Sequence, residues 1–356
     1  MKNYIKGGLL KTLFGLLFSQ IAVGQDFTLS QFQTNAHIFN PACIGNSESE
    51  VKLGVTYRNQ WYASGFPYQT IVASGEMKFN PNPGKIKQMA VALSFADDQI
   101  GNGQWRNTWV FTGFSVAKNL DVANRHSLSF GISSALLMRQ FNAKNLIFEN
   151  QFETSTFEFN PSLSSGENEG ALRQSFFQVN SGLNYKFIVD EHLEFGIGAS
   201  ALWLYRPNEA LTNLTTNSFA KMNSRFTGIF SARWKMTDDL WIDPQVFLSQ
   251  QGKAREINFG GWFVFNSTLE KNKVWQTSFG CFSRLSDAII PAIRLGTERI
   301  FGQLSYDFTT SGAKNANIDE KFMGLGGMGA LEFSLVYGLD FRPKYSKSFP
   351  IPCQKF

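Results

Sequence analysis

The sequence has 356 residues, which is long enough for two soluble domains or one large barrel. Hydrophobic residues make up 43% of it and charged residues only 17%, with 36 Phe, which suits a surface that partly meets lipid. The formal net charge is +5, but three lysines lie in the first 24 residues, and the rest carries 30 basic and 28 acidic residues. This small excess gives no indication of nucleic-acid binding.

Residues 1–24 have the pattern of a secretory signal peptide. Lys2, Lys6 and Lys11 lie in a stretch without acidic residues, an apolar run covers residues 13–18, and small residues follow at 22–24. The apolar run is too short to span a bilayer. We therefore expect cleavage before Gln25 and export across the inner membrane.

Residues 25–50 are expected to form an irregular lead-in segment on the periplasmic side, because their polar and Pro content disfavours a strand. From residue 51 to residue 341, strand-like runs alternate with turn residues, and no convincing amphipathic helix interrupts them. The runs cover residues 51–58, 67–79, 89–96, 107–118, 127–137, 175–187, 192–204, 224–235, 240–250, 254–266, 274–284, 288–296, 299–309 and 331–341.

The final run alternates without a slip. Apolar residues occupy every odd position from Leu331 to Phe341, and small or polar residues occupy most of the even positions. A strand has a side-chain period of two, so this pattern gives one face to lipid and one to water. The sequence predicts an all-β fold, namely a transmembrane antiparallel up-and-down barrel of roughly 14 strands closed by pairing of residues 331–341 with residues 51–58.

Connection lengths favour the barrel over the alternative, a soluble β-sandwich. The three longest connections, residues 138–174, 205–223 and 310–326, all follow odd-numbered strands, whereas residues 189–191 and 237–239 are tight turns after even-numbered ones. Outer-membrane barrels have long extracellular loops and short periplasmic turns. An even strand count also returns residues 342–356, a basic tail, to the periplasm.

Several short motifs, in order and spacing, resemble the PorP/SprF family of outer-membrane proteins of the type IX secretion system of Bacteroidetes. The likeness covers essentially the whole mature chain. The motifs are Ser30-Gln31-Phe32, Asn40-Pro41-Ala42 with Gly45, residues 57–61, residues 93–101, residues 302–308, residues 331–335 and Cys353-Gln354-Lys355-Phe356. The chain departs from the family at Cys43, where an aromatic is usual, and at Gln354, where Pro is usual.

The resemblance implies a barrel in the cell outer membrane without enzymatic activity or cofactors. Its partners would be outer-membrane lipid, an exported protein substrate and the periplasmic ring components of the secretion system. Some members support secretion or surface anchoring of one large, adhesin-like exported protein, as in gliding motility. The alternative function is a passive channel for small solutes. Small inward residues such as Gly196, Gly198 and Ser200 leave space for either a pore or an inserted polypeptide.

Strand alternation points Arg58 and Arg294 into the lumen, where they can line a pore or pair with an acid such as Asp307 or Glu332. Trp61, Trp105 and Trp203 fall near the predicted outer ends of strands, where an aromatic girdle is the simplest interpretation. The candidates for lumen or partner contact are Arg58, Trp61, Arg294, Asp307, Glu332, Cys43, Cys353 and Phe356.

No catalytic or metal-binding arrangement is predicted. His37 lies in the lead-in, His126 and His192 lie at predicted turns, and none is spaced to activate a serine nucleophile. No CxxC or His-rich cluster suggests zinc. Cys43 and Cys353 share the predicted periplasmic side, so either a disulfide or two unlinked thiols is open, while Cys281 belongs to a strand.

Overall fold

The computed structural model describes residues 26–62, 67–80, 86–101, 105–142, 148–153, 155–160, 162–164, 172–208, 221–270, 273–297, 299–311 and 329–341. The predicted signal peptide and the tail at residues 342–356 lie outside these ranges.

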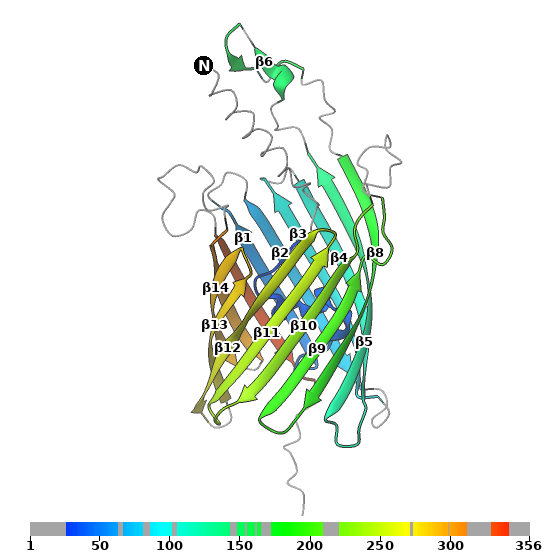
Figure 1. Ribbon diagram of the computed structural model, residues 1–356, viewed down its shortest axis with the longest axis vertical. Helices are drawn as coiled ribbons and strands as arrows, with labels where there is room; N and C mark the ends of the chain where they lie inside the picture. Colours follow the sequence, from blue (N-terminus) through cyan, green and yellow to red (C-terminus); the bar gives the residue numbers. More distant parts are fainter. Residues whose placement is uncertain are drawn as a thin grey trace, which may run out of the picture.

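Within the described residues, fourteen antiparallel strands close into a barrel, which confirms the predicted fold (Figure 1). Each strand pairs with its neighbours in chain order, and β16 pairs with β1. The strands are β1 (Val51–Gln60), β2 (Tyr68–Phe79), β3 (Gln88–Ile100), β4 (Trp105–Asn119), β5 (His126–Phe141), β8 (Leu172–Ile188), β9 (Leu193–Leu202), β10 (Arg225–Lys235), β11 (Leu240–Gln251), β12 (Ala254–Glu270), β13 (Lys273–Arg284), β14 (Ala288–Thr297), β15 (Ile300–Thr309) and β16 (Ala330–Leu339).

The closing pair has the register that the alternation implies. Val55 faces Leu335 and Arg58 faces Glu332 across β1 and β16. The odd residues of β16 point outward and are exposed, as Phe333 shows at 46%, whereas Glu332 and Ser334 are 1% exposed inside. Apolar side chains therefore cover the outside of the wall and polar ones line the inside, the reverse of a soluble protein.

Two short strands stand apart from the wall in the connection between β5 and β8. They are β6 (Phe152–Glu153) and β7 (Glu158–Phe159), preceded by the 3₁₀ turn η3 (Glu149–Gln151), and they form a small hairpin beyond one end of the barrel (Figure 1). The connections β5–β8, β9–β10 and β15–β16 leave the barrel at this same end, here called the loop end, since strands alternate in direction. In the described part of the chain, no helix is long and apolar enough to cross a membrane.

The segment before β1 lies inside the barrel, so the interpretation of residues 25–50 as a lead-in outside the barrel needs correction. Residues 26–45, here called the plug, form η1 (Phe32–Asn35), α2 (Ala36–Phe39) and η2 (Pro41–Cys43). Asn40 begins η2 by accepting the Ala42 N–H at 2.9 Å, and Pro41 occupies the first turn, where no N–H is needed. The polar content of this segment correctly indicated that it is not a strand. The same content is compatible with a position inside a polar lumen, which the prediction did not consider.

The plug and the wall share a hydrophobic core within the lumen. The aromatic rings of Phe32 and Phe39 pack on Phe247 of β11, with ring centroids 5.0 and 5.2 Å apart respectively. Fully burying one such side chain stabilises a fold by about 1.5–3 kcal/mol, so the plug is an integral part of the folded barrel. The core residues are Phe27, Leu29, Phe32, Ile38, Phe39, Val72, Ala96, Trp109, Phe111, Ala135, Leu137, Phe176, Leu202, Trp203, Met222 and Phe247.

Candidate functional site

A buried charge cluster holds the plug at Ser30. Arg58 pairs with Asp307 at 2.9 Å and with Glu332 at 3.2 Å, and Arg284 pairs with Asp307 at 3.1 Å. The Ser30 hydroxyl donates to Asp307 Oδ1 at 2.7 Å, while its backbone N–H donates to Glu332 Oε2 at 2.8 Å. The Arg58 guanidinium also donates to the Ser30 hydroxyl. The structure thus brings together three sequence candidates, Arg58, Asp307 and Glu332, around the plug.

Neighbouring groups balance the charges in this cluster. Glu256 on β12 lies 3.5 Å from Arg284 and 3.8 Å from Arg225. The partly exposed Asp287 lies 2.8 Å from Arg284, so three arginines face four carboxylates. The side chains of Arg58, Asp307 and Glu332 are at most 3% exposed. Buried ions require partners of opposite charge and hydrogen bonds, because water no longer solvates them. Removing Arg58 would leave Glu332 buried without a cation within 4 Å among the described residues.

A second ionic contact joins the middle of the plug to β1 and β2. Glu76 accepts from the Lys52 ammonium at 2.9 Å and lies 3.1 Å from His37 Nδ1, and the Gly45 N–H donates to it at 2.8 Å. Lys52 also donates to the Thr34 carbonyl oxygen. His37 is therefore a buried lumen residue and not an exposed one, because its segment turns back into the barrel.

The corner of the plug at Asn40 and Pro41 rests against glycines of the wall. A Cβ atom on Gly131 of β5 would collide with the Pro41 backbone, and one on Gly182 of β8 would collide with the Asn40 side chain. These glycines face each other across the β5–β8 pair. The backbone can approach the wall this closely only where the wall has no side chain.

Hydrogen bonds complete the fit of this corner. The Asn40 amide donates to the Leu183 carbonyl oxygen at 3.0 Å. The Phe39 carbonyl oxygen accepts from the hydroxyls of Ser200 at 2.6 Å and Thr227 at 3.0 Å. Because an irregular segment has no strand partner, side chains of the wall satisfy its backbone groups.

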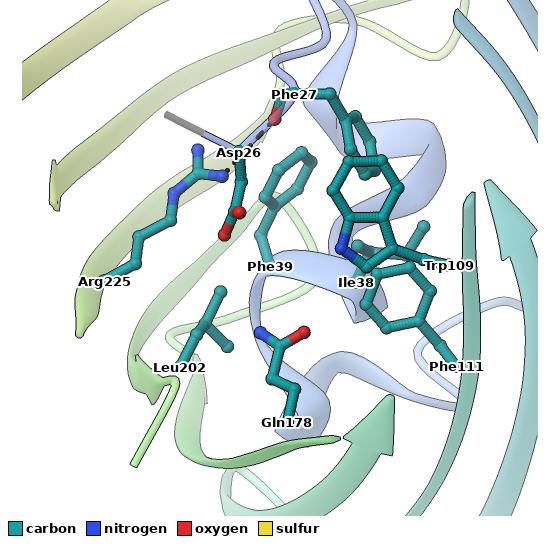
Figure 2. A pocket seen from close by; sticks show the side chains of 9 residues that line it. All are labelled: Asp26, Phe27, Ile38, Phe39, Trp109, Phe111, Gln178, Leu202 and Arg225. Atoms are coloured by element: carbon teal, nitrogen blue, oxygen red, sulfur yellow. Dashed lines mark hydrogen bonds between the residues drawn. The ribbon is translucent and has the colours of Figure 1, made fainter. Parts of the chain in front are cut away.

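Two small cavities lie between the plug and the wall. Figure 2 shows a cavity where Phe27 and Phe39 face the wall and Arg225 donates to the Phe27 carbonyl oxygen. Its volume of about 10 Å³ is room for roughly one water molecule. A second cavity of the same volume lies beside His37 and Ser94. Neither is large enough for a small-molecule ligand.

The other sequence candidates lie elsewhere. Arg294 points inward, but it donates to Gln303 Oε1 at 2.9 Å and stacks on Trp262, 4.3 Å from the ring centroid, away from the charge cluster. Trp61 is half-buried at the end of β1, where its ring meets Tyr68 edge-on. Cys43 is buried within the plug and forms no disulfide with another described residue. Cys353 and Phe356 lie outside the described residues, and so does any bond between Cys43 and Cys353.

The prediction of an outward girdle is wrong for Trp203. Its side chain is fully buried in the lumen, and its indole N–H donates to Asp26 Oδ2 at 2.7 Å. Strand β9 ends at Leu202, and Trp203 has a φ of +57°, so the alternation that pointed it outward no longer applies. Trp105 is half-buried at the start of β4, with the Arg139 guanidinium 5.3 Å from its ring centroid.

The turn histidines do not form a site. His126 is half-buried at the start of β5, stacks on Phe187 and lies 2.6 Å from the Tyr185 hydroxyl, while His192 is 52% exposed in its side chain. Among the described residues, no group of three or more His, Cys, Asp or Glu is arranged to hold a metal ion.

Ser30 belongs to one of the family-like motifs but was not predicted as a contact residue, and neither Arg284 nor the plug as a whole was predicted. A signal was nevertheless present, since glycines such as Gly131 and Gly182 recur at inward positions on neighbouring strands. Such a glycine patch indicates a close backbone approach from inside.

A closed antiparallel wall, an apolar exterior and a lumen filled by the preceding segment define the class: a membrane β-barrel with an internal plug. A solved structure agrees with this fold. A FadL homologue from Pseudomonas aeruginosa is 10% identical with a TM-score of 0.50, covering 87% of this chain and 94% of that one. The toluene transporter TbuX of Ralstonia pickettii is 11% identical with a TM-score of 0.46, covering 85% and 92% of the two chains.

The sequence itself matches the family of type IX secretion system membrane proteins PorP/SprF over residues 22–323. Since the match extends over most of the sequence, the chain belongs to this family, as the motifs at both ends of the barrel suggested. No curated protein matches it. The family is one of secretion-system membrane proteins, and closed barrels of this kind are the outer-membrane type, so family and fold together point to the outer membrane.

Proposed function

We propose that this protein supports the secretion or surface anchoring of a large exported protein by binding it, without chemistry of its own. Membership of a type IX secretion family supplies the setting. The observation that carries the proposal is the filled lumen: the plug packs Phe27, Phe32 and Phe39 across it, and the two cavities beside it hold about one water each.

The alternative function, passive diffusion of small solutes, is disfavoured by the same observation. A diffusion channel needs a continuous aqueous path, as porins have. Here ion pairs and a hydrophobic core hold the plug within the lumen. Purified protein in a planar bilayer is therefore expected to show no steady conductance, and a stable open channel would favour the diffusion hypothesis.

Gene deletion tests the proposal directly. The deletion strain is expected to lose one or a few large proteins from its surface and culture medium, and re-expression of the wild-type gene should restore them. Unchanged export together with altered uptake of small solutes would contradict the proposal. The protein itself should occur in the outer-membrane fraction and migrate faster on gels before heating.

A further inference from the structure

One section of the lumen wall carries buried polar groups that bind nothing among the described residues. The strand registers place three of these residues in one row across the sheet: Trp241 on β11, Ser278 on β13 and Gln303 on β15. Val264 on β12 and Arg294 on β14 lie between them in the same row. The indole N–H of Trp241, the hydroxyl of Ser278 and the amide nitrogen of Gln303 have no hydrogen-bond partner there. Ser278 and Gln303 are 1% and 2% exposed.

The adjacent row repeats the pattern. Ser305 of β15 and Trp262 of β12 lie in register through Ala292 and Gly280, and the Ser305 hydroxyl and Trp262 indole N–H are likewise buried and unpartnered in the described structure. Buried polar groups in folded proteins are nearly always hydrogen-bonded, so five on one patch require an explanation.

The plug does not supply the missing partners, although it lies near this wall. The Gln31 N–H donates to Glu332 on β16, and the preceding Ser30 carbonyl oxygen accepts from Asn258 on β12. The backbone thus spans the barrel above β13–β15, yet both amide atoms of the Gln31 side chain are also unpartnered among the described residues. The plug thus reaches this wall through Ser30, which also contacts Arg284 and Asp307, but the five groups remain without partners among the described residues.

We propose that this wall, from β11 to β15, is a binding site for an extended polypeptide segment of the exported partner. The inference rests on the proposed function. All five of these groups can donate a hydrogen bond, and backbone carbonyl oxygens are matching acceptors. The same wall carries acceptors without a hydrogen-bond partner among the described residues, such as Asp243 Oδ1 and Gln245 Oε1, which match backbone N–H groups. Four strand spacings make the row about 19 Å long, the length of about six residues of extended chain. Arg294, stacked on Trp262 within the patch, adds a cation for a carboxylate.

Entry to the site requires movement of residues 26–35 of the plug. Ions and hydrogen bonds hold these residues at Ser30, and polar groups of a partner can replace them. Phe27, Leu29 and Phe32 also pack in the lumen core, so the incoming segment must cover the apolar surface that they leave. Residues 40–45 are instead fitted sterically against glycine. The incoming segment therefore displaces the first half of the plug while the second half stays in place.

The double variant Ser278→Ala with Ser305→Ala tests the site, since neither hydroxyl has a partner among the described residues. It removes two unpartnered polar groups, so the purified variant should unfold at the same or a higher temperature than the wild type. Export of the proteins lost in the deletion strain should nevertheless fall about tenfold. Ser129→Ala, at a buried position on β5 outside this wall, is the matched control: it should leave the unfolding temperature and export close to those of the wild type.

Normal export by a stably folded double variant would overturn the inference and leave the proposed function standing, provided that gene deletion still abolishes export. If the double variant fails to fold, photo-cross-linking tests the site instead. A compact diazirine amino acid is encoded at position 303, and in a control variant at position 133. Irradiation of exporting cells should cross-link position 303 alone to a protein that the deletion strain loses. No adduct, or a protease-resistant polysaccharide adduct, would overturn the inference.

Discussion

Residues 29–31 and residues 40–44 of the plug are attached to the barrel in different ways. Around Ser30, the wall offers long charged side chains, Arg58, Asp307 and Glu332, which reach the plug across the lumen. Around Pro41, the wall offers glycines, and the plug backbone comes to the sheet itself. The first attachment depends on charge balance and the second on shape.

This difference has a mechanical consequence. Ion pairs and hydrogen bonds can be exchanged for those of water or a partner without rebuilding the wall, whereas a backbone fitted against glycine has no equivalent substitute. The charged attachment is thus suited to reversible release, and the glycine attachment to permanent anchoring. The predictions below test this contrast.

The largest effect is expected from Arg58→Met. The substitution leaves Glu332 buried without its cation and leaves Asp307 with Arg284 alone. Removing one partner of a buried ion pair typically costs about 3–5 kcal/mol in the free energy of unfolding. Urea titration of the folded barrel in detergent, followed by heat-dependent gel mobility, measures this loss.

Arg299→Ala is the control for Arg58→Met, since Arg299 pairs with Asp340 but is 55% exposed in its side chain. An exposed pair contributes about 0–1 kcal/mol, so this variant should unfold nearly like the wild type. Adding Glu332→Gln to Arg58→Met should recover part of the stability, because the unpaired charge is then gone. Equal stability of Arg58→Met and the wild type would contradict the charge-balance argument.

Gly131→Leu should destabilise the barrel by about 3 kcal/mol, the upper range for overpacking, because the new side chain collides with the Pro41 backbone. Gly302→Leu is the matched control, since a Cβ there meets no atom within 4 Å. Thermal unfolding of the two variants measures the difference. If both variants unfold alike, the steric account of the second attachment is wrong.

The wall of the barrel was predictable from sequence because lipid and water impose a period of two on every strand. That period also directed Arg58 inward, and closure of β1 on β16 placed Glu332 beside it. The predicted strand ends were less accurate. β5 continues to Phe141, beyond the predicted end at residue 137, because the alternating pattern that lipid imposes stops before the strand does.

The plug was not predictable in the same way. Residues 26–45 have no period, and polar content alone does not distinguish a segment in water from one in a polar lumen. The partners of Ser30 come from β12, β13, β15, β16 and β1, which are brought together only by closure of the barrel. The prediction for Trp203 was wrong for a local reason. Trp203 follows the last residue of β9 and has a left-handed backbone, which turns its side chain into the lumen.

A smaller effect is expected from Thr227→Val. The substitution removes one of two hydroxyls that donate to the Phe39 carbonyl oxygen and keeps the Ser200 hydroxyl in place. The loss should be about 1 kcal/mol, the usual net value of a single hydrogen bond. Thr227→Val with Ser200→Ala should cost more than the sum of the two single changes, because the carbonyl oxygen is then left without either donor. Urea titration measures these losses. If the loss in the double variant equals the sum of the two single losses, water has replaced the missing hydroxyls as donor to the Phe39 carbonyl oxygen.

The mildest test leaves both attachments intact and measures the reactivity of Cys43. With Cys281→Ser and Cys353→Ser, Cys43 is the only thiol, and burial in the plug raises its pKa to about 12. Since only the thiolate reacts, about one thiol in 10⁴ is reactive at pH 8, and labelling by a charged maleimide should be about a thousandfold slower than in urea.

Arg58→Met in this background should leave that protection largely in place, because Cys43 belongs to the glycine-fitted half of the plug. Gly131→Leu should remove it. Rapid labelling in both variants would mean that the plug leaves the lumen as one unit and that its two attachments do not act independently.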